Sequence, residues 1–209
     1  MTPTRNPMIS LRKNPKQARS ETSVSVILEA AIQVLAKEGA SRFTTARVAE
    51  KAGVSIGSLY QYFPNKAAIL FRLQSDEWKQ TFELLNRLLG DATISPLQRL
   101  RNLVHAFIQS ECEEADMRVA LDDAAPLYRH APEARQVREQ GEAAIDAFMQ
   151  EVLPGIEEAT RRRATDLIST TLSTVGKEYS QTPRTPEEIA DYADAMADMF
   201  CAYLRQLSS

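Results

Sequence analysis

The sequence predicts an all-α fold of about nine helices, with a small N-terminal domain and a larger C-terminal one. Apolar residues recur three and four positions apart in most segments, which is the spacing of one face of a helix. No stretch shows the sustained period-two alternation of a strand, so we expect no sheet. Hydrophobic residues make up 44% of the 209 positions, which is ample for a core.

Residues 1–19 are expected to form a basic, flexible arm. They carry three prolines and five basic residues and no acidic residue. Such an arm can lie along a minor groove or along the phosphate backbone of DNA. It can equally be a solvated tail with a chance excess of charge, and the sequence leaves both interpretations open.

A first helix is expected over residues 21–37, with Gly39 ending it. Its apolar face consists of Ile27, Ala30, Ala31, Val34 and Leu35. This helix should pack across the next two helices and complete a three-helix domain over residues 20–66.

Residues 44–63 predict two short helices joined by a tight turn. Thr44 is a good N-cap, because its hydroxyl can accept a hydrogen bond from a free backbone N–H at the helix start. Gly53 ends the first helix, where a residue with positive φ is usually needed. Ser55 caps the second helix, and Pro64 follows it. The inward-facing positions are Val48, Ala49, Ala52, Leu59 and Phe63.

The outer surface of the second short helix suits an approach to DNA. It carries Ile56, Gly57, Ser58, Tyr60, Gln61 and Tyr62. A helix that enters the major groove needs short or flat side chains near its N-terminus, so that it can reach the base edges. Neither Asp nor Glu occurs between Lys51 and Lys66, so no acidic side chain repels phosphate there.

The run from Ala49 to Lys66, AEKAGVSIGSLYQYFPNK, resembles the signature of the TetR/AcrR family of transcriptional regulators. The match has no gaps and combines the small, aromatic and lysine positions of that signature. The resemblance covers about residues 20–80, and the rest of the chain is similar to the family only in length and helical character. It implies a helix-turn-helix DNA-binding domain followed by a ligand-binding and dimerisation domain over residues 67–209.

The motif predicts two groups of DNA-contacting residues. Phosphate contacts are expected from Thr44, Thr45, Tyr60, Tyr62 and Lys66. Contacts at or near the base edges are expected from Arg47, Ile56, Gly57, Ser58 and Gln61, beside the capping residue Ser55. Gln61 can pair with adenine, whereas Arg47 can either read a guanine or contact phosphate. The family often has an arginine near the position of Val24, so that phosphate contact is not expected from Val24 itself, and Thr22, Ser23 or Arg19 can substitute for it.

A long helix is expected from Asn65, a fair N-cap, to Leu89, before Gly90. At 1.5 Å per residue it would span about 36 Å. Because it begins at the DNA side and ends in the second domain, it is the natural mechanical link between the two. Further helices are expected over residues 96–112, 115–123, 132–153, 156–179 and 186–207.

The last two helices, about residues 156–179 and 186–207, have wide apolar faces interrupted by small residues. Such faces suit close packing against a partner subunit. The resemblance implies a homodimer in which these helices and their symmetry mates form a four-helix interface. The alternative is that both are ordinary core helices. A twofold dimer would place two recognition helices on successive major grooves of a roughly palindromic operator.

Eight bulky side chains of the second domain are expected to surround one interior. They are Trp78, Phe82, His105, Phe107, Met117, Tyr128, Phe148 and Met149. A concave, mostly apolar pocket with a few polar groups is the usual small-molecule site, and the resemblance implies that it receives a partly apolar inducer. Each of these side chains alone is more typical of plain core than of a ligand contact.

Few residues suggest an enzyme, so no catalytic residue, cofactor or metal site is expected. The chain has two histidines, no Gly-rich phosphate loop and no GxSxG motif. Asp122 and Asp123 could hold a cation or simply end a helix on its solvent side, and we favour the second interpretation. Cys112 and Cys201 lie far apart and indicate reduced thiols in a cytoplasmic protein. No apolar run approaches the roughly 18 residues that cross a bilayer, so no membrane contact is expected.

The charge is distributed unevenly along the chain. Residues 1–66 contain ten Lys and Arg and four Asp and Glu, a net charge of +6, whereas residues 67–209 carry −9. A basic front suits contact with a polyanion. With the resemblance, this predicts a ligand-responsive DNA-binding transcriptional regulator, a repressor released from a palindromic operator by a small-molecule inducer. The competing hypotheses are a helical small-molecule-binding protein or enzyme with a vestigial helix-turn-helix head, and a protein-interaction adaptor.

Overall fold

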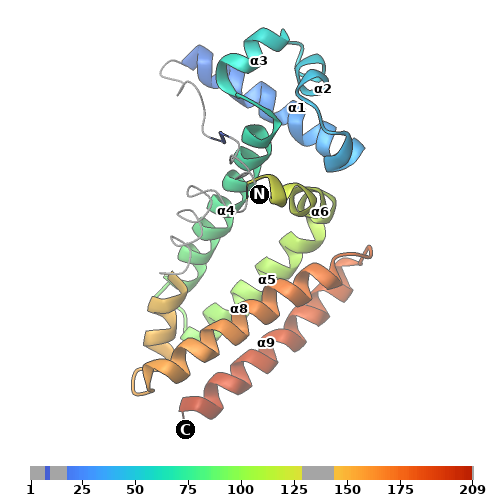
Figure 1. The fold of residues 1–209 in the computed structure, drawn as a ribbon. Helices are drawn as coiled ribbons and strands as arrows, with labels where there is room; N and C mark the ends of the chain where they lie inside the picture. The colour runs from blue at the N-terminus through green and yellow to red at the C-terminus, as the bar shows by residue number, and fades with distance from the viewer. Residues whose placement is uncertain (1–7, 10–17, 129–143, 209) are drawn as a thin grey trace, which may run out of the picture. The chain divides into compact units, whose positions relative to one another are not determined.

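The computed structural model describes residues 8–9, 18–128 and 144–208, and every regular element in this part of the chain is helical, as predicted (Figure 1). The helices are α1 (Ala18–Arg42), α2 (Thr45–Lys51), α3 (Ile56–Tyr62), α4 (Lys66–Leu89), α5 (Pro96–Glu113), α6 (Ala115–Ala124), the 3-10 helix η1 (Ala125–Leu127), α8 (Glu158–Tyr179) and α9 (Pro186–Ser208). Residues 144–152 are also helical. Most of the expected arm and the first part of the helix expected at 132–153 lie outside the described residues.

The chain divides into two compact units. The first comprises residues 1–79 and 116–137, and the second comprises residues 80–115 and 138–209. Helix α4 therefore begins in the first unit and ends in the second, and the chain crosses back between α5 and α6. In the described part of the chain, no helix combines the length and the apolarity that a membrane span requires.

The first unit has a core shared by α1, α2, α3 and the first half of α4. Its largest fully buried side chains include Ile27, Leu35, Phe43, Leu59 and Phe63. Val24 of α1 is buried in the same core. A charged side chain would be costly in such surroundings, so an apolar residue suits this position.

Gly39 interrupts α1, as expected, but one more turn follows it. Its backbone has φ 71° and ψ 170°, which is not helical, and the helix resumes as far as Arg42. Glycine reaches positive φ without steric cost. Gly39 therefore kinks the chain and positions the last turn of α1 close to the start of α2.

Helix α6 and η1 are attached to the first half of α4 by a buried polar network. The Tyr128 hydroxyl lies within hydrogen-bond distance of Gln74 Oε1 (3.2 Å) and of the Leu121 carbonyl (3.1 Å). Gln74 Nε2 donates to Glu77 Oε2 (2.9 Å). Glu77 in turn pairs with Arg118 of α6. The network explains why α6 belongs to the same unit as α1–α3.

Two residues that precede α1 are attached to the start of α4. Ile9 is buried in the core of the first unit. Asn65 Nδ2 donates to the Met8 carbonyl (2.9 Å), and Asn65 Oδ1 accepts a hydrogen bond from the Ala68 N–H (2.9 Å). Asn65 thus caps α4, as expected, and also anchors the segment before α1.

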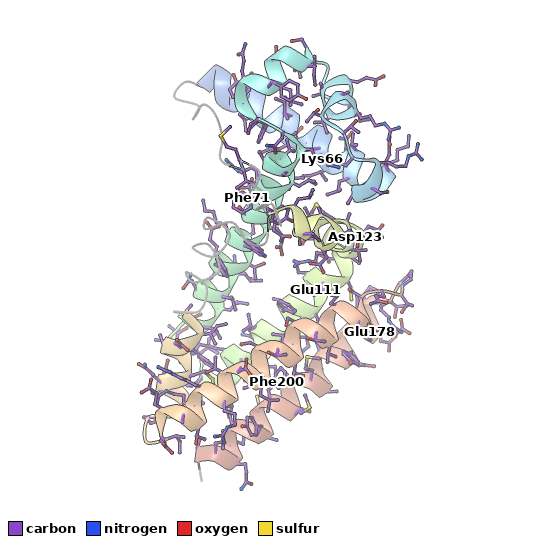
Figure 2. The ribbon with its side chains drawn as sticks, in the orientation of Figure 1. Lys66, Phe71, Glu111, Asp123, Glu178 and Phe200 are labelled. Atoms are coloured by element: carbon purple, nitrogen blue, oxygen red, sulfur yellow. The ribbon has the colours of Figure 1, made fainter. Side chains whose placement is uncertain are left out.

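In the second unit, α5 lies against α8 and α9. Gly176 lets α5 and α8 approach closely, because a Cβ at this position would lie 3.1 Å from Phe107 Cε1 and 3.3 Å from Ile108 Cδ1. Phe200 of α9 is buried in the core of this unit (Figure 2). The close approach brings the ring of Phe107 to the inner side of α8.

Arg99 is a buried cation that joins three elements of the second unit. Its guanidinium bonds the Leu89 carbonyl at the end of α4 and the Glu151 carboxylate. The same group lies 5.6 Å from the centre of the Phe148 ring. Arg99 thereby holds the end of α4 and residues 148–151 against α5.

Helix α9 begins at a capping box. The Thr185 N–H donates to Glu188 Oε2 (2.7 Å), and the Glu188 N–H donates to Thr185 Oγ1 (3.2 Å). The two bonds satisfy backbone donors at the helix start reciprocally. The bond from the Thr185 backbone is the largest cause that lowers the pKa of Glu188 below its ordinary value of 4.5.

Candidate DNA-reading surface and interior cavity

The turn between α2 and α3 is fixed by two backbone hydrogen bonds. The Gly53 N–H donates to the Glu50 carbonyl (3.1 Å), and the Val54 N–H donates to the Ala49 carbonyl (3.0 Å). This pair of bonds is the Schellman motif, which needs positive φ at the residue after the helix. Gly53 supplies it with φ 66°.

Both short helices begin at their expected N-caps. The Thr44 hydroxyl accepts a hydrogen bond from the Arg47 N–H (3.3 Å), and the Ser55 hydroxyl accepts one from the Ser58 N–H (3.0 Å). The Ser55 and Ser58 hydroxyls are 2.8 Å apart and bond each other. These contacts fix the N-terminus of α3 relative to the turn.

The N-terminal edge of α3 is open, while its opposite face is buried. Ile56, Gly57 and Gln61 are exposed, and Leu59 is fully buried. A Cβ built on Gly57 would meet only Ser55 Oγ, at 3.8 Å. The fold therefore does not require glycine at this position, and the missing side chain leaves room for another surface to approach α3.

Further polar side chains stand on α2, α3 and the start of α4. Tyr60 Oη and Thr45 Oγ1 lie 3.0 Å apart, so a hydrogen bond links α3 to α2. Tyr62 and Lys66 are half-buried, and Lys66 is the first residue of α4 (Figure 2). Because α3 itself contains no acidic residue, the surface offers donors without a carboxylate.

Arg47 is engaged by the last turns of α1. Its Nη1 bonds the Glu38 carboxylate and the Arg42 carbonyl (2.9 Å). The guanidinium thus holds α2 to α1. Both bonds use Nη1 alone and restrict the guanidinium, and Arg47 differs in this respect from Gln61, which is exposed.

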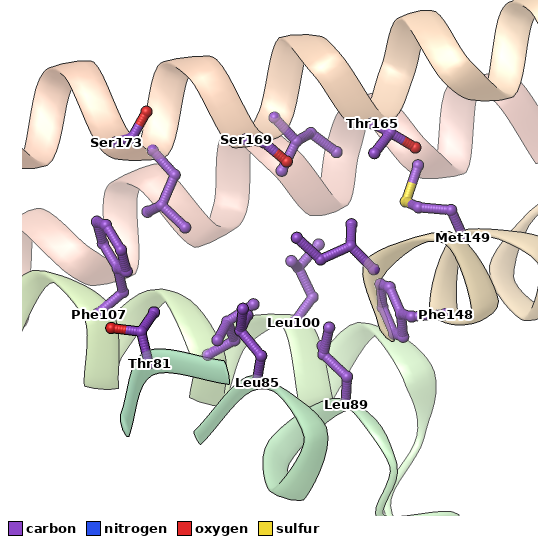
Figure 3. A pocket seen from close by; sticks show the side chains of 14 residues that line it. Thr81, Leu85, Leu89, Leu100, Phe107, Phe148, Met149, Thr165, Ser169 and Ser173 are labelled. Atoms are coloured by element: carbon purple, nitrogen blue, oxygen red, sulfur yellow. The ribbon is translucent and has the colours of Figure 1, made fainter. Parts of the chain in front are cut away.

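The second unit contains a cavity between α4, α5, residues 145–149 and α8 (Figure 3). Its volume is about 110 Å³, counted as the space open to the centre of a water molecule. A single water needs about 10–15 Å³ when counted in the same way. The cavity therefore has room for a small organic molecule. Its lining residues are Thr81, Leu85, Leu89, Leu100, Leu103, Phe107, Ile145, Phe148, Met149, Thr165, Ile168, Ser169, Leu172 and Ser173.

The structure brings three of the eight expected interior side chains to this cavity. Phe107, Phe148 and Met149 line it, and Phe82 packs partly buried against the same core. His105 instead faces α9, where its Nε2 lies 3.0 Å from Asp194 Oδ1. This hydrogen bond is the largest cause that lowers the pKa of Asp194 below its ordinary value of 3.8.

The other three expected residues, Trp78, Met117 and Tyr128, belong to the core of the first unit. The expectation that all eight surround one interior was therefore wrong. The physical reason is that α6, η1 and the first half of α4 contribute their apolar side chains to the core of the first unit. Asp122 and Asp123 of α6 are both exposed, on the solvent side of that helix.

Sequence analysis missed most of the cavity lining. The aliphatic members are ordinary core residues by composition, and nothing in the sequence marks them as a cavity wall. One signal was available, since Thr165, Ser169 and Ser173 recur every four residues along α8 and form a hydroxyl row on the cavity side. That row becomes meaningful only when the facing helices are known.

The outward faces of α8 and α9 each expose a large apolar side chain. Leu167 and Met199 are each 51% exposed in the single chain. Ala195 and Ala202, about one turn on either side of Met199, are also exposed. The wide apolar faces seen in the sequence are therefore partly buried in the core of the second unit and partly exposed in the single chain.

The chain matches two family models. Residues 95–207 match the tetracycline repressor-like C-terminal domain, and residues 27–73 match the model of bacterial regulatory proteins of the tetR family. Nucleoid occlusion factor SlmA of Vibrio campbellii is 39% identical over 83 residues, which are 39% of this chain and 42% of that protein. The chain spans about two fifths of the length of the curated relatives it matches first.

Two solved structures of regulators named FadR have a similar fold. The fatty acid degradation regulator FadR from Bacillus halodurans has a TM-score of 0.68 at 18% identity, covering 90% of this chain and 97% of that one. FadR from Bacillus subtilis, solved in complex with stearoyl-CoA, has a TM-score of 0.68 at 17% identity, covering 85% and 97%. Because the C-terminal model matches more than half of the chain and the N-terminal model spans the α2–α3 motif, this protein belongs to the TetR family of bacterial regulatory proteins.

Proposed function

We propose that this protein is a ligand-responsive transcriptional repressor, which leaves a palindromic DNA operator when a small, largely apolar molecule enters the cavity of its second unit. The observation that carries the proposal is the open N-terminal edge of α3. That edge combines the bare backbone of Gly57 with exposed polar groups and no carboxylate, next to a turn fixed by backbone hydrogen bonds. A helix of this kind fits a major groove.

The residues of the motif divide between two tasks in this proposal. Phosphates are contacted by Thr44, Thr45, Tyr60, Tyr62 and Lys66. Base edges are met or approached by Ile56, Gly57, Ser58 and Gln61, with Ser55 holding the start of the helix. Arg47 is placed in the second group too, where it could read a guanine or merely contact phosphate.

The active form is proposed to be a homodimer through α8 and α9. The half-exposed side chains of Leu167 and Met199 would be covered there, and the small residues Ala195 and Ala202 would let the helices approach closely. A twofold axis would present two copies of α3 to successive major grooves. The proposal implies a cytoplasmic protein with access to chromosomal DNA.

Helix α4 is the proposed route from cavity to DNA. Its residues Thr81, Leu85 and Leu89 line the cavity, and the same helix begins at Lys66 beside α3. A ligand can shift the spacing of the two DNA-binding domains of the dimer, its two heads, only if it binds one spacing more tightly than the other. The apolar lining supports a largely apolar effector. The stearoyl-CoA in the Bacillus subtilis FadR structure shares that character only in its acyl chain, because its CoA part is charged.

Fluorescence anisotropy with duplex DNA from upstream of the gene tests the DNA-binding part. Affinity should fall steeply with salt, because phosphate contacts release counterions. Gln61→Ala should change the preference at one base step of each half-site by about 1–3 kcal/mol. Lys66→Ala should weaken all sequences alike and reduce the salt slope of the dimer by about 2, because each of its two copies loses one phosphate contact.

Two outcomes would contradict different parts of the proposal. A purified protein that ignores every duplex at low ionic strength would leave a helical small-molecule-binding protein as the better hypothesis. A ligand that occupies the cavity without changing operator affinity would refute the coupling through α4 and leave DNA binding intact.

A further inference from the structure

One wall of the cavity carries nearly all of its polar groups. Thr165, Ser169 and Ser173 stand on α8 at four-residue spacing, so their hydroxyls form a row about 12 Å long. The only other polar lining residue is Thr81 on α4, and no charged residue lines the cavity in the part of the chain described here (Figure 3). The site is thus a long apolar space with a hydrogen-bonding strip on one side.

The three hydroxyls of the strip differ in the bonds they already make. Thr165 Oγ1 donates to the Arg161 carbonyl (3.1 Å), and Ser173 Oγ donates to the Thr170 carbonyl (3.2 Å). Helical serines and threonines commonly bond to the preceding turn in this way. Ser169, between them, makes no such bond within residues 144–208 and 18–128, although it is partly buried. Its O–H is the donor that remains available to another molecule.

We infer that the cavity takes an uncharged, largely apolar molecule with an acceptor oxygen part-way along its length, and that this oxygen receives the Ser169 hydroxyl. The inference rests on the proposed function in treating the cavity as the effector site, and it names the chemical class of that effector. A carboxylate is disfavoured, because burying an anion without a cationic partner costs far more than burying a carbonyl. A carbonyl or ether oxygen would lose its water but gain one hydrogen bond.

Titration calorimetry on the full-length protein with two matched probes tests this inference. Dibutyl ketone has its carbonyl at the centre of an alkyl chain, and nonanoate has the same number of carbons with a terminal charge at neutral pH. The ketone should bind at least about tenfold more tightly than nonanoate. No DNA is present, so the result is independent of operator binding.

Three substitutions locate the interaction. Ser169→Ala should weaken ketone binding about 2- to 10-fold, which is the range for one hydrogen bond. Ser173→Ala makes the same chemical change on the same wall, but its donor is already bonded to Thr170 and the ketone offers no donor of its own. This control should leave ketone affinity unchanged. Ser169→Leu should abolish binding by filling the cavity.

Each contrary result overturns the inference. Nonanoate that binds as tightly as the ketone would exclude the uncharged class. Equal losses in Ser169→Ala and Ser173→Ala would remove the special role of Ser169, and ketone binding that survives Ser169→Leu would move the site elsewhere. If neither probe binds while the operator is still bound, the inferred ligand class fails and the DNA-binding function stands.

Discussion

Two glycines of the helix-turn-helix illustrate different reasons for the same residue. Gly53 has φ +66°, a conformation that other residues rarely adopt, so the turn itself needs it. Gly57 has no positive φ, and a Cβ there would make only an ordinary contact at 3.8 Å. The small size of Gly57 is therefore useful to whatever approaches α3, and not to the fold.

Gly57→Leu should separate DNA binding from stability. We expect operator affinity to fall more than tenfold, because the added side chain stands on the edge that would enter the groove. The melting temperature should stay the same or rise, since glycine in a helix is about 1 kcal/mol less favourable than a good helix former. Anisotropy and thermal unfolding measure the two effects.

Gly53→Leu is the matched control, and we expect it to lower the melting temperature where Gly57→Leu does not. A leucine forced into the left-handed region costs about 1–2 kcal/mol, so this variant should melt at a lower temperature. Undiminished operator binding by Gly57→Leu would show that the edge of α3 does not approach DNA closely.

Arg47 is a residue whose role the structure makes testable. Its pairing with Glu38 is partly exposed, so a double-mutant cycle with Arg47→Ala and Glu38→Ala should give a coupling of about 0.2–1 kcal/mol in the free energy of unfolding. We expect Arg47→Ala to leave base preference unchanged. A changed preference at a single base pair would instead identify Arg47 as a base contact.

At the scale of elements, local chemistry made the helices predictable. Thr44, Ser55 and Asn65 were expected as N-caps, and each accepts a backbone hydrogen bond at the start of its helix. Caps and turns depend on residues a few positions apart, so they can be predicted directly from the sequence. The expected end of α1 at Gly39 was also sound, apart from the single turn that follows the kink.

The partners of each helix could not be predicted in the same way. Trp78 and Phe82 are four residues apart on α4, yet they pack against different cores. Periodicity shows which face of a helix is apolar, but not which other helix covers it. The cavity lies where particular helices face one another, so its polar wall could not be predicted and Ser169 was missed. Phe107, Phe148 and Met149 were expected only because they are bulky.

The attachment of η1 to α4 depends on the Tyr128 hydroxyl. Tyr128→Phe removes the donor near Gln74 Oε1 and the Leu121 carbonyl, both buried. Leaving a buried acceptor without its donor costs about 1–3 kcal/mol, so the denaturant midpoint of the first unit should fall. Tyr60→Phe makes the same change at an exposed hydroxyl and should cost less than about 0.5 kcal/mol. Equal effects would mean that the buried network contributes little.

At the scale of the whole molecule, the net positive charge lies where DNA contact is proposed. Residues 1–66 carry +6 and the remainder −9. The number of phosphate contacts sets how steeply affinity falls with salt. A dimer with two heads on one operator should therefore show about twice the salt slope of a single head, and this difference connects oligomeric state to DNA binding.

Leu167→Arg combined with Met199→Arg should dissociate the proposed dimer. The substitutions put like charges on the outward faces of α8 and α9, where the single chain leaves two large apolar side chains half exposed. The variant should then sediment as a monomer, while its helicity stays unchanged. Operator affinity should drop, and the slope of log affinity against log salt should fall to about half, because one head neutralises half as many phosphates.

Val119→Arg supplies the control for this last test. Val119 is an apolar residue of α6 that is 44% exposed, so its replacement adds one arginine, half the added charge of the double variant, on a surface outside the proposed interface. That variant should remain dimeric and keep the full salt slope. A double variant that is still dimeric would exclude α8 and α9 as the interface. A monomer with an unchanged slope would mean that a single head already makes all of the phosphate contacts, and the twofold model of operator recognition would have to be abandoned.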